Sequence, residues 1–169
     1  MTVEKINQQI KLNLFSPRTE IVLEALNQVK SVGNRFYIPL LFDLLVTQPE
    51  QEIENEILKI LGNVKDKETV NSFMRGIEEE KYRSIRKKIL TSCWQNGLDF
   101  STFLPVFIDQ IINEDWEIAF EAFTVIDNLE FLPGDPILSL SIQKITNALE
   151  SANSQKQYFL NEILIKLNN

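Results

Sequence analysis

The fold is indicated most clearly by one short stretch of the sequence, Ile53-Glu54-Asn55-Glu56-Ile57-Leu58-Lys59-Ile60-Leu61. Its apolar positions 53, 57, 58 and 61 are spaced i, i+4, i+5 and i+8, which places them on one face of an α-helix. The same spacing returns at 21–29, 85–93 and 118–126, in steps of 32 or 33 residues. The sequence therefore predicts a helix that is repeated at least four times.

The repeated helices align in four apolar columns: Ile21, Ile53, Ile85 and Ile118; Ala25, Ile57, Ile89 and Ala122; Leu26, Leu58, Leu90 and Phe123; Val29, Leu61, Cys93 and Ile126. The helices between them share a further column of Leu41, Met74, Phe107 and Leu140, with a step of 33 residues. A repeat of two helices cannot bury its own apolar face, so neighbouring repeats must stack to form the core. This pattern favours a solenoid over an irregular helical bundle, which is the alternative.

Breaks between the periodic runs divide the chain into helical segments. Pro49, Gly62, Gly97 and Pro133-Gly134 mark such breaks, and Ser16-Pro17 is expected to cap the second helix. The predicted helices span 3–14, 17–32, 36–47, 50–61, 67–79, 81–94, 102–112, 115–128, 136–150 and 155–167. They form a single domain, 1–169, of five antiparallel hairpins at roughly 1–33, 34–65, 66–98, 99–132 and 133–169. The expected fold is all-α.

Two units resemble HEAT repeats. The stretch 37–45 (YIPLLFDLL) looks like the first HEAT helix, with Pro39 inside its opening turns, and 103–108 (FLPVFI) repeats that form. The stretch 56–62 (EILKILG) resembles the end of the second HEAT helix, and Ile85-Arg86 stands where the family often has Val-Arg. The family's arginine is absent at Val22, Glu54 and Ala119. The resemblance implies a right-handed α-α superhelix whose second helices line a concave face, usually for protein partners.

The composition excludes several kinds of site. The chain has no histidine, so no Ser-His or Cys-His pair can form. Its single cysteine, Cys93, allows no internal disulfide and no multi-cysteine zinc site, and it falls in an apolar column. No pair of helices carries matched inward carboxylates, and no glycine loop could cradle a phosphate. We therefore expect no catalytic residue, no metal and no cofactor.

The charge and the apolar runs bear on partners. A net charge of −7 disfavours nucleic-acid binding unless a local basic patch overrides it. The longest apolar stretch, 36–42, is too short to span a bilayer, and residues 1–14 lack the apolar core of a signal peptide. We expect a soluble, cytoplasmic protein with no membrane partner, as a monomer or a weak homodimer.

One candidate binding face is basic. Arg83, Arg86 and Lys87 are spaced i, i+3 and i+4 on a predicted helix, beside Lys81 and Lys88. They could bind an acidic partner. The alternative is an ordinary solvated face, neutralised by opposite charges in the neighbouring units. Such ion pairs between stacked units, or charge ladders, would join Glu54 to Arg86, and Lys88 to Glu56 and Glu121.

The second candidate is Trp116. Its column contains only polar residues, which favours an exposed tryptophan of the kind enriched at binding hot spots, although packing at the end of the array is equally open. Asp115 is expected to cap its helix. By contrast, the loop 94–101 is expected to be an ordered corner that buries Trp94 and Phe100 and in which Gly97 has a positive φ. Ser101 is expected to cap the next helix, and Asp99 to brace the turn.

These observations lead to one main functional hypothesis and two alternatives. The main hypothesis is a non-catalytic protein-binding or scaffold module that uses the concave face. Its partner-binding residues would be Trp116, Arg83, Arg86, Lys87, Glu54 and Glu121. The alternatives are a nucleic-acid-acting protein similar to the HEAT-like DNA glycosylases, and an accessory subunit of a lyase or hydrolase.

Overall fold

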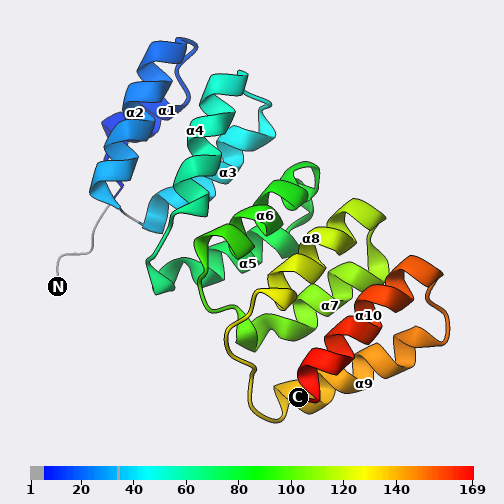
Figure 1. Cartoon of the computed structure of the whole chain (residues 1–169). Coiled ribbons are helices and arrows are strands. Elements are labelled where there is room, and N and C mark those ends of the chain that lie inside the picture. Colours follow the sequence, from blue (N-terminus) through cyan, green and yellow to red (C-terminus); the bar gives the residue numbers. More distant parts are fainter. Residues whose placement is uncertain (1–5, 34) are drawn as a thin grey trace.

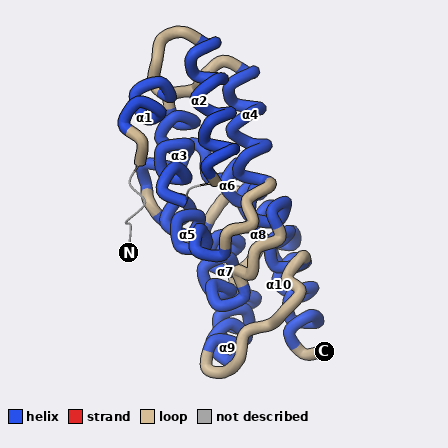
Figure 2. The backbone as a smooth tube through the Cα atoms, turned by 90° about the vertical axis from the view of Figure 1, so that its left-hand side faces the viewer, coloured by secondary structure: helices blue, strands red, loops and turns tan. Residues whose placement is uncertain are grey.

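The computed structural model describes residues 6–33 and 35–169, and this part of the chain consists of helices and the loops that connect them, without a strand (Figure 2). Its α-helices are α1 (Gln8–Leu14), α2 (Thr19–Val32), α3 (Ile38–Val46), α4 (Gln51–Gly62), α5 (Val70–Glu78), α6 (Arg86–Asn96), α7 (Leu104–Asn113), α8 (Trp116–Asp127), α9 (Ile137–Leu149) and α10 (Ser154–Leu167). Short 3-10 helices precede four of them: η1 (Arg35–Tyr37), η2 (Lys67–Thr69), η3 (Glu80–Ile85) and η4 (Ser101–Phe103). The start of the predicted helix 3–14 lies outside the described residues.

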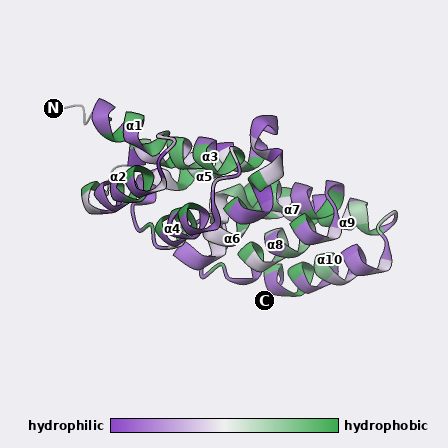
Figure 3. Cartoon of the chain, turned by 90° about the horizontal axis from the view of Figure 1, so that it is seen from above, coloured by the Kyte–Doolittle hydropathy of each residue, from purple (hydrophilic) through white to green (hydrophobic). Residues whose placement is uncertain are grey.

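Consecutive helices pair as hairpins, and the hairpins follow one another along the molecule (Figure 1). The helices α2, α4, α6, α8 and α10 pack side by side in chain order. Seen from above, they run along one side, and α1, α3, α5, α7 and α9 run along the other (Figure 3). We call the side formed by α2, α4, α6, α8 and α10 the even-helix face. None of the helices in the described part of the chain is long and apolar enough to cross a membrane.

The helix ends follow from local sequence. Asp115 Oδ1 accepts a hydrogen bond of 3.1 Å from Ile118 N at the start of α8, as predicted, and Asn153 Oδ1 accepts one from Lys156 N at the start of α10. Gly33 and Gly97 end α2 and α6 with φ values of 62° and 66°. This left-handed conformation suits glycine because it has no Cβ.

Most residues of the predicted columns lie in the core, although Ile21, Leu58 and Phe123 are only partly buried. Every member of the columns that begin with Ala25 and Val29 is at most 3% exposed. In the other helix layer, Leu41, Met74 and Phe107 are buried, but Leu140 is 48% exposed, so its placement in that column is wrong. On α9 the buried positions belong to Ser141 and Ile145, since the long connection before this helix shifts its register.

A line of aromatic rings runs through the middle of the core. Tyr82, Phe42, Phe73, Phe100 and Phe107 contact one another in that order, edge to face, with successive ring centroids 5.5, 5.8, 6.1 and 5.9 Å apart. We call these residues the aromatic spine. Its members come from η3, α3, α5, the loop before η4, and α7, so the spine joins the second, third and fourth hairpins. Edge-to-face pairs of this kind add to the stabilisation that burial itself provides.

Some predicted helix starts and caps are wrong. The helix after Ser16-Pro17 begins at Thr19, with Arg18 as a cap residue that makes no side-chain hydrogen bond. The predicted helices 36–47, 67–79, 81–94 and 102–112 are each divided into a 3-10 helix, η1 to η4 in that order, and the α-helix that follows it. Ser101 lies within η4 and is not a cap; instead Asp99 Oδ1 accepts a hydrogen bond of 2.9 Å from Ser101 N, which confirms its role as the brace of this turn.

Candidate interaction surface

An exposed group of aromatic side chains lies on the even-helix face where α8 and α10 meet. Because Asp115 caps α8, Trp116 is the first residue of the helix and Phe120 lies one turn further on the same side. The rings of Trp116 and Phe120 stack, with centroids 5.4 Å apart and planes inclined by 15°. Trp116 is 49% exposed, so the structure places it at the surface and not in the core.

The helix α10 completes this group. Phe159 packs against Phe120, with centroids 6.2 Å apart, and Tyr158 meets Phe159 edge-on at 6.0 Å. We call Trp116, Phe120, Tyr158 and Phe159 the aromatic surface. Phe159 is buried, whereas Phe120 and Tyr158 are 42% and 61% exposed. The group lines a shallow hollow of about 340 Å³ with Ser154 and Gln155 at its edge.

Phe120 and Tyr158 were not predicted from the sequence as surface residues. A signal for Phe120 was present, because it follows Trp116 by four residues and so shares its side of the helix. Tyr158 precedes the buried Phe159, and adjacent residues of a helix point about 100° apart. Only the packing of α10 against α8 shows that both helices bring these rings to one place.

Arg86 is not at the surface. It is 4% exposed, and its Nη1 donates a hydrogen bond of 2.8 Å to Glu114 Oε1. Arg83 Nη2 donates one of 3.2 Å to the other oxygen of Glu114, and Glu80 lies within 4 Å of both arginines. The predicted binding face of Arg83, Arg86 and Lys87 is therefore wrong for Arg86, whose guanidinium is enclosed by the fold.

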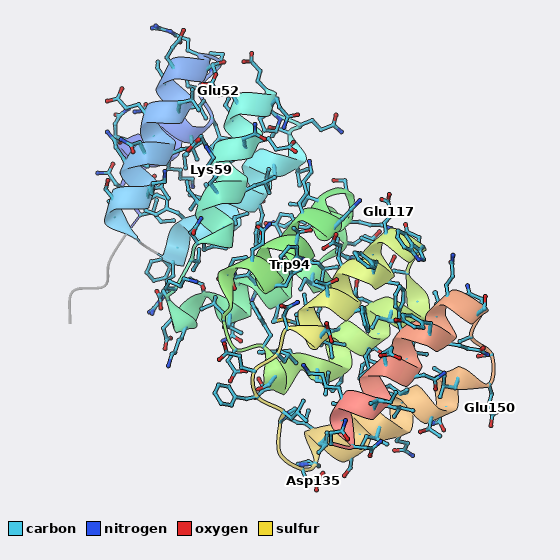
Figure 4. The ribbon with its side chains drawn as sticks, in the orientation of Figure 1. Glu52, Lys59, Trp94, Glu117, Asp135 and Glu150 are labelled. Carbon is cyan, nitrogen blue, oxygen red and sulfur yellow. The ribbon has the colours of Figure 1, made fainter. Side chains whose placement is uncertain are left out.

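Oppositely charged residues join neighbouring helices across the even-helix face. Lys87 on α6 pairs with Glu117 on α8 at 3.2 Å, and Lys88 on α6 pairs with Glu54 on α4 at 2.9 Å. Figure 4 labels Glu117 near the beginning of α8. The charge ladders proposed as the alternative to a basic binding face thus exist, although the partners differ from the predicted ones. They leave the lysines partly neutralised and still exposed.

The carboxylate of Glu121 accepts a hydrogen bond from a tryptophan side chain. Trp94 Nε1 donates a hydrogen bond of 2.9 Å to Glu121 Oε2, across the contact between α6 and α8. Trp94 is half-buried, whereas Phe100 is only 1% exposed. The prediction that both are enclosed is therefore confirmed for Phe100 and only in part for Trp94. Since Glu54 is paired as well, neither predicted acidic contact is a free carboxylate.

Groups that could support chemistry are few within residues 6–33 and 35–169. In these ranges, no three histidine, cysteine, aspartate or glutamate side chains are grouped so that they could hold a metal ion. Cys93 is buried, as predicted, and burial raises the pKa of its thiol well above the ordinary value. A buried, protonated thiol is not a nucleophile.

No protein-family model matches the chain, and no curated protein matches its sequence.

Proposed function

We propose that the chain is a HEAT-like α-solenoid of five hairpins that binds a protein partner through the even-helix face and catalyses no reaction. The repeat of 32 or 33 residues and the ordered packing of α2, α4, α6, α8 and α10 support the architecture. Pro39 and Pro105, each the second residue of its helix, support the family resemblance. In such an array, the second helices would line the concave side.

The aromatic surface is the observation that carries this proposal. Three large rings, those of Trp116, Phe120 and Tyr158, are each at least 42% exposed and lie together on two adjacent helices. Tryptophan and tyrosine are enriched among the residues that dominate binding energy, because they bury a large area with few rotatable bonds. Stacking on Phe120 holds the Trp116 ring in place before a partner arrives, which lowers the entropy lost on binding.

Charged side chains beside the aromatic surface could form the polar rim of a protein interface. Lys87 and Glu117 pair beside Trp116, and both remain about half exposed or more, at 48% and 65%. A polar rim around an apolar centre is the usual arrangement of a protein interface. Because the basic side chains of α6 are paired with carboxylates, we do not propose a nucleic-acid ligand.

Affinity capture from the native cell extract tests the proposal. The bait would be the full chain, compared with the double variant Trp116→Ala/Tyr158→Ala and with Phe131→Ala as the control. Phe131 is 66% exposed but lies in the loop after α8, away from the aromatic surface. We expect the partner bound by the wild type and the control to be lost from the double variant, while all three melt at similar temperatures.

Two outcomes of this experiment would contradict the proposal. If the double variant captures the same proteins as the wild type, the aromatic surface is not the binding site. If its melting temperature falls markedly together with capture, the two rings serve the fold.

A further inference from the structure

A cavity of about 360 Å³ lies in the N-terminal half of the array, away from the aromatic surface. Its walls come from the ends of α2 and α4, from η1 and the start of α3, and from the residues that connect α4 to α5. Ligand pockets in proteins have volumes of about 300 to 1,000 Å³. The cavity is therefore large enough for a small organic molecule.

The inner wall of this cavity is apolar. Val29 and Ile38 are buried core residues, and Ile60 and Val64 are partly buried against the same core. Two of them lie on even-numbered helices, one begins α3, and Val64 follows α4 in the chain. A hydrocarbon or aromatic group placed against these side chains would leave water for an apolar environment, which is favourable in proportion to the area buried.

The rim of the cavity is cationic. Lys30, Arg35, Lys59 and Lys65 line it, from α2, η1, α4 and the following loop, and the single acidic residue of the lining is Asp66. Figure 4 labels Lys59 on α4. The Asp66 carboxylate is engaged locally, since its Oδ1 accepts a hydrogen bond of 2.9 Å from Glu68 N. The cations of the rim outnumber the acid and come from four separate segments.

Two lysines of the rim also contact a carboxylate of the chain itself, Glu56, which does not line the cavity. Lys59 Nζ lies 2.6 Å from Glu56 Oε1, and Lys30 Nζ lies 3.7 Å from Glu56 Oε2. The hydrogen bond from Lys59 is the main cause that lowers the pKa of Glu56, and the charge of Lys30 acts in the same direction. Two lysines that line the cavity, on neighbouring helices, thus converge on one carboxylate.

Each of the four cations of the rim also has a partner within the fold. Lys30 and Lys59 lie in the last turns of α2 and α4, where positive charge complements the helix dipole. Arg35 and Lys65 lie outside any α-helix. Arg35 pairs with the exposed Glu68 at 3.6 Å, an interaction of little strength. Lys65 Nζ is held at 2.6 Å from the carbonyl oxygen of Asn96, which fixes its position beside the cavity.

We propose that this cavity binds a small amphipathic organic anion, with its apolar body against Val29, Ile38, Ile60 and Val64 and its carboxylate or phosphate group at the rim. Arg35 and Lys65 bind the anionic group by charge-assisted hydrogen bonds, which are stronger than neutral ones. The volume of the cavity limits the apolar body to a short acyl chain or a ring system of two or three rings. This site is independent of the protein-binding role, because it lies on other hairpins.

The probe for the test is 8-anilinonaphthalene-1-sulfonate (ANS), an apolar ring system with one sulfonate whose fluorescence rises in apolar surroundings. ANS would be titrated into the full-length chain, into Arg35→Gln/Lys65→Gln and into Lys11→Gln/Arg18→Gln. The last variant loses the same number and kind of charges on exposed residues away from the cavity. Octanoate, octanol and octylammonium would then compete with bound ANS.

We expect one ANS molecule to bind per chain. The dissociation constant should rise by about tenfold or more in Arg35→Gln/Lys65→Gln and stay unchanged in Lys11→Gln/Arg18→Gln. Octanoate should displace ANS, octanol should do so more weakly, and octylammonium should fail. Val64→Trp, which fills the cavity, should abolish binding. Near-ultraviolet circular dichroism of every variant would exclude ANS binding to unfolded chains.

Three results would overturn the proposal. The first is equal ANS affinity in the two charge variants. The second is displacement by octylammonium as readily as by octanoate. The third is loss of ANS binding in Trp116→Ala/Tyr158→Ala but not in Val64→Trp, which would place the dye on the aromatic surface.

Discussion

Arg86 Nη1 lies 2.8 Å from Glu114 Oε1, and the two side chains are only 5% and 15% exposed. The pair joins α6 to the turn between α7 and α8. A charge in such a position is tolerated only while its counter-charge remains, because the protein has replaced water there, and Glu114 is the nearer and more enclosed of the two carboxylates beside Arg86, the other being the exposed Glu80. The pair therefore links the third hairpin to the fourth.

Removal of the carboxylate should destabilise the fold. We expect Glu114→Gln to lower the free energy of unfolding by about 3 kcal/mol, since Arg86 would keep its charge in a nearly closed site. Urea denaturation monitored by circular dichroism measures this change. Glu117→Gln is the matched control: it removes the partner of Lys87, and because both of these side chains are exposed the loss should be less than about 1 kcal/mol. Equal losses in the two variants would contradict the expectation.

Replacement of Gly76 should destabilise the fold, although this residue lies within a helix. A Cβ at this position would come within 2.6 Å of Phe42 Cε2 and 2.9 Å of Ile89 Cδ1. Alanine favours a helix over glycine by about 1 kcal/mol, but overpacking a core costs about 1 to 3 kcal/mol. We expect Gly76→Ala to lower the melting temperature. Gly134→Ala, where a Cβ meets no atom within 4 Å, should leave it unchanged or slightly higher.

The fold should be destabilised by replacement of Phe100, the member of the aromatic spine that lies in a loop. Phe100 contacts Phe73 and Phe107 and is 1% exposed, although it lies outside any helix. We expect Phe100→Ala to lower the free energy of unfolding by about 3 to 5 kcal/mol, from lost burial and the cavity left behind. Phe131→Ala, at a 66% exposed loop position, should change it by less than about 0.5 kcal/mol. A small effect at Phe100 would mean that the loop repacks.

The thiol of Cys93 should make the free energy of unfolding depend on pH in the alkaline range. The buried Cys93 has a raised pKa, so the unfolded chain ionises first as pH rises and the folded chain keeps its proton. The stability that this group contributes is complete below the ordinary thiol pKa, about 8.5, and falls as pH rises above it, by up to about 1.4 kcal/mol per pH unit. We expect the difference in unfolding free energy between the wild type and Cys93→Ala to be constant from pH 6 to 8 and to shrink by pH 10. Tyr82, whose pKa burial also raises, is present in both proteins and cancels. A constant difference through pH 10 would contradict this assignment.

Periodicity was enough to locate the helices, because burial of one face requires a spacing that the sequence displays directly. It did not show which polar residues are enclosed. Arg86 shares its column with Val22, Glu54 and Ala119, and two of these four are apolar and buried. That composition was a signal that the position faces inward. The spacing of Arg83, Arg86 and Lys87 points the other way, because these three residues by themselves form one charged helix face.

The remaining errors arise where tertiary contacts compete with local rules. Leu140 fits its column by number, yet α9 turns Ser141 and Ile145 inward, since a longer connection precedes it. The aromatic surface needs two helices, and no pattern within one of them shows how α10 packs against α8. The cavity could not be predicted at all, because its cations come from four segments that only the fold brings together.

The aromatic spine also bears on how the chain opens. In arrays where each hairpin touches only its neighbours, the ends can unfold separately from the middle. Rings from the second, third and fourth hairpins contact one another through Phe42, Phe73 and Phe100, so none of these hairpins can detach without losing an edge-to-face contact. The central three hairpins should therefore protect their amide hydrogens as one cooperative block, with α1–α2 and α9–α10 exchanging through smaller openings.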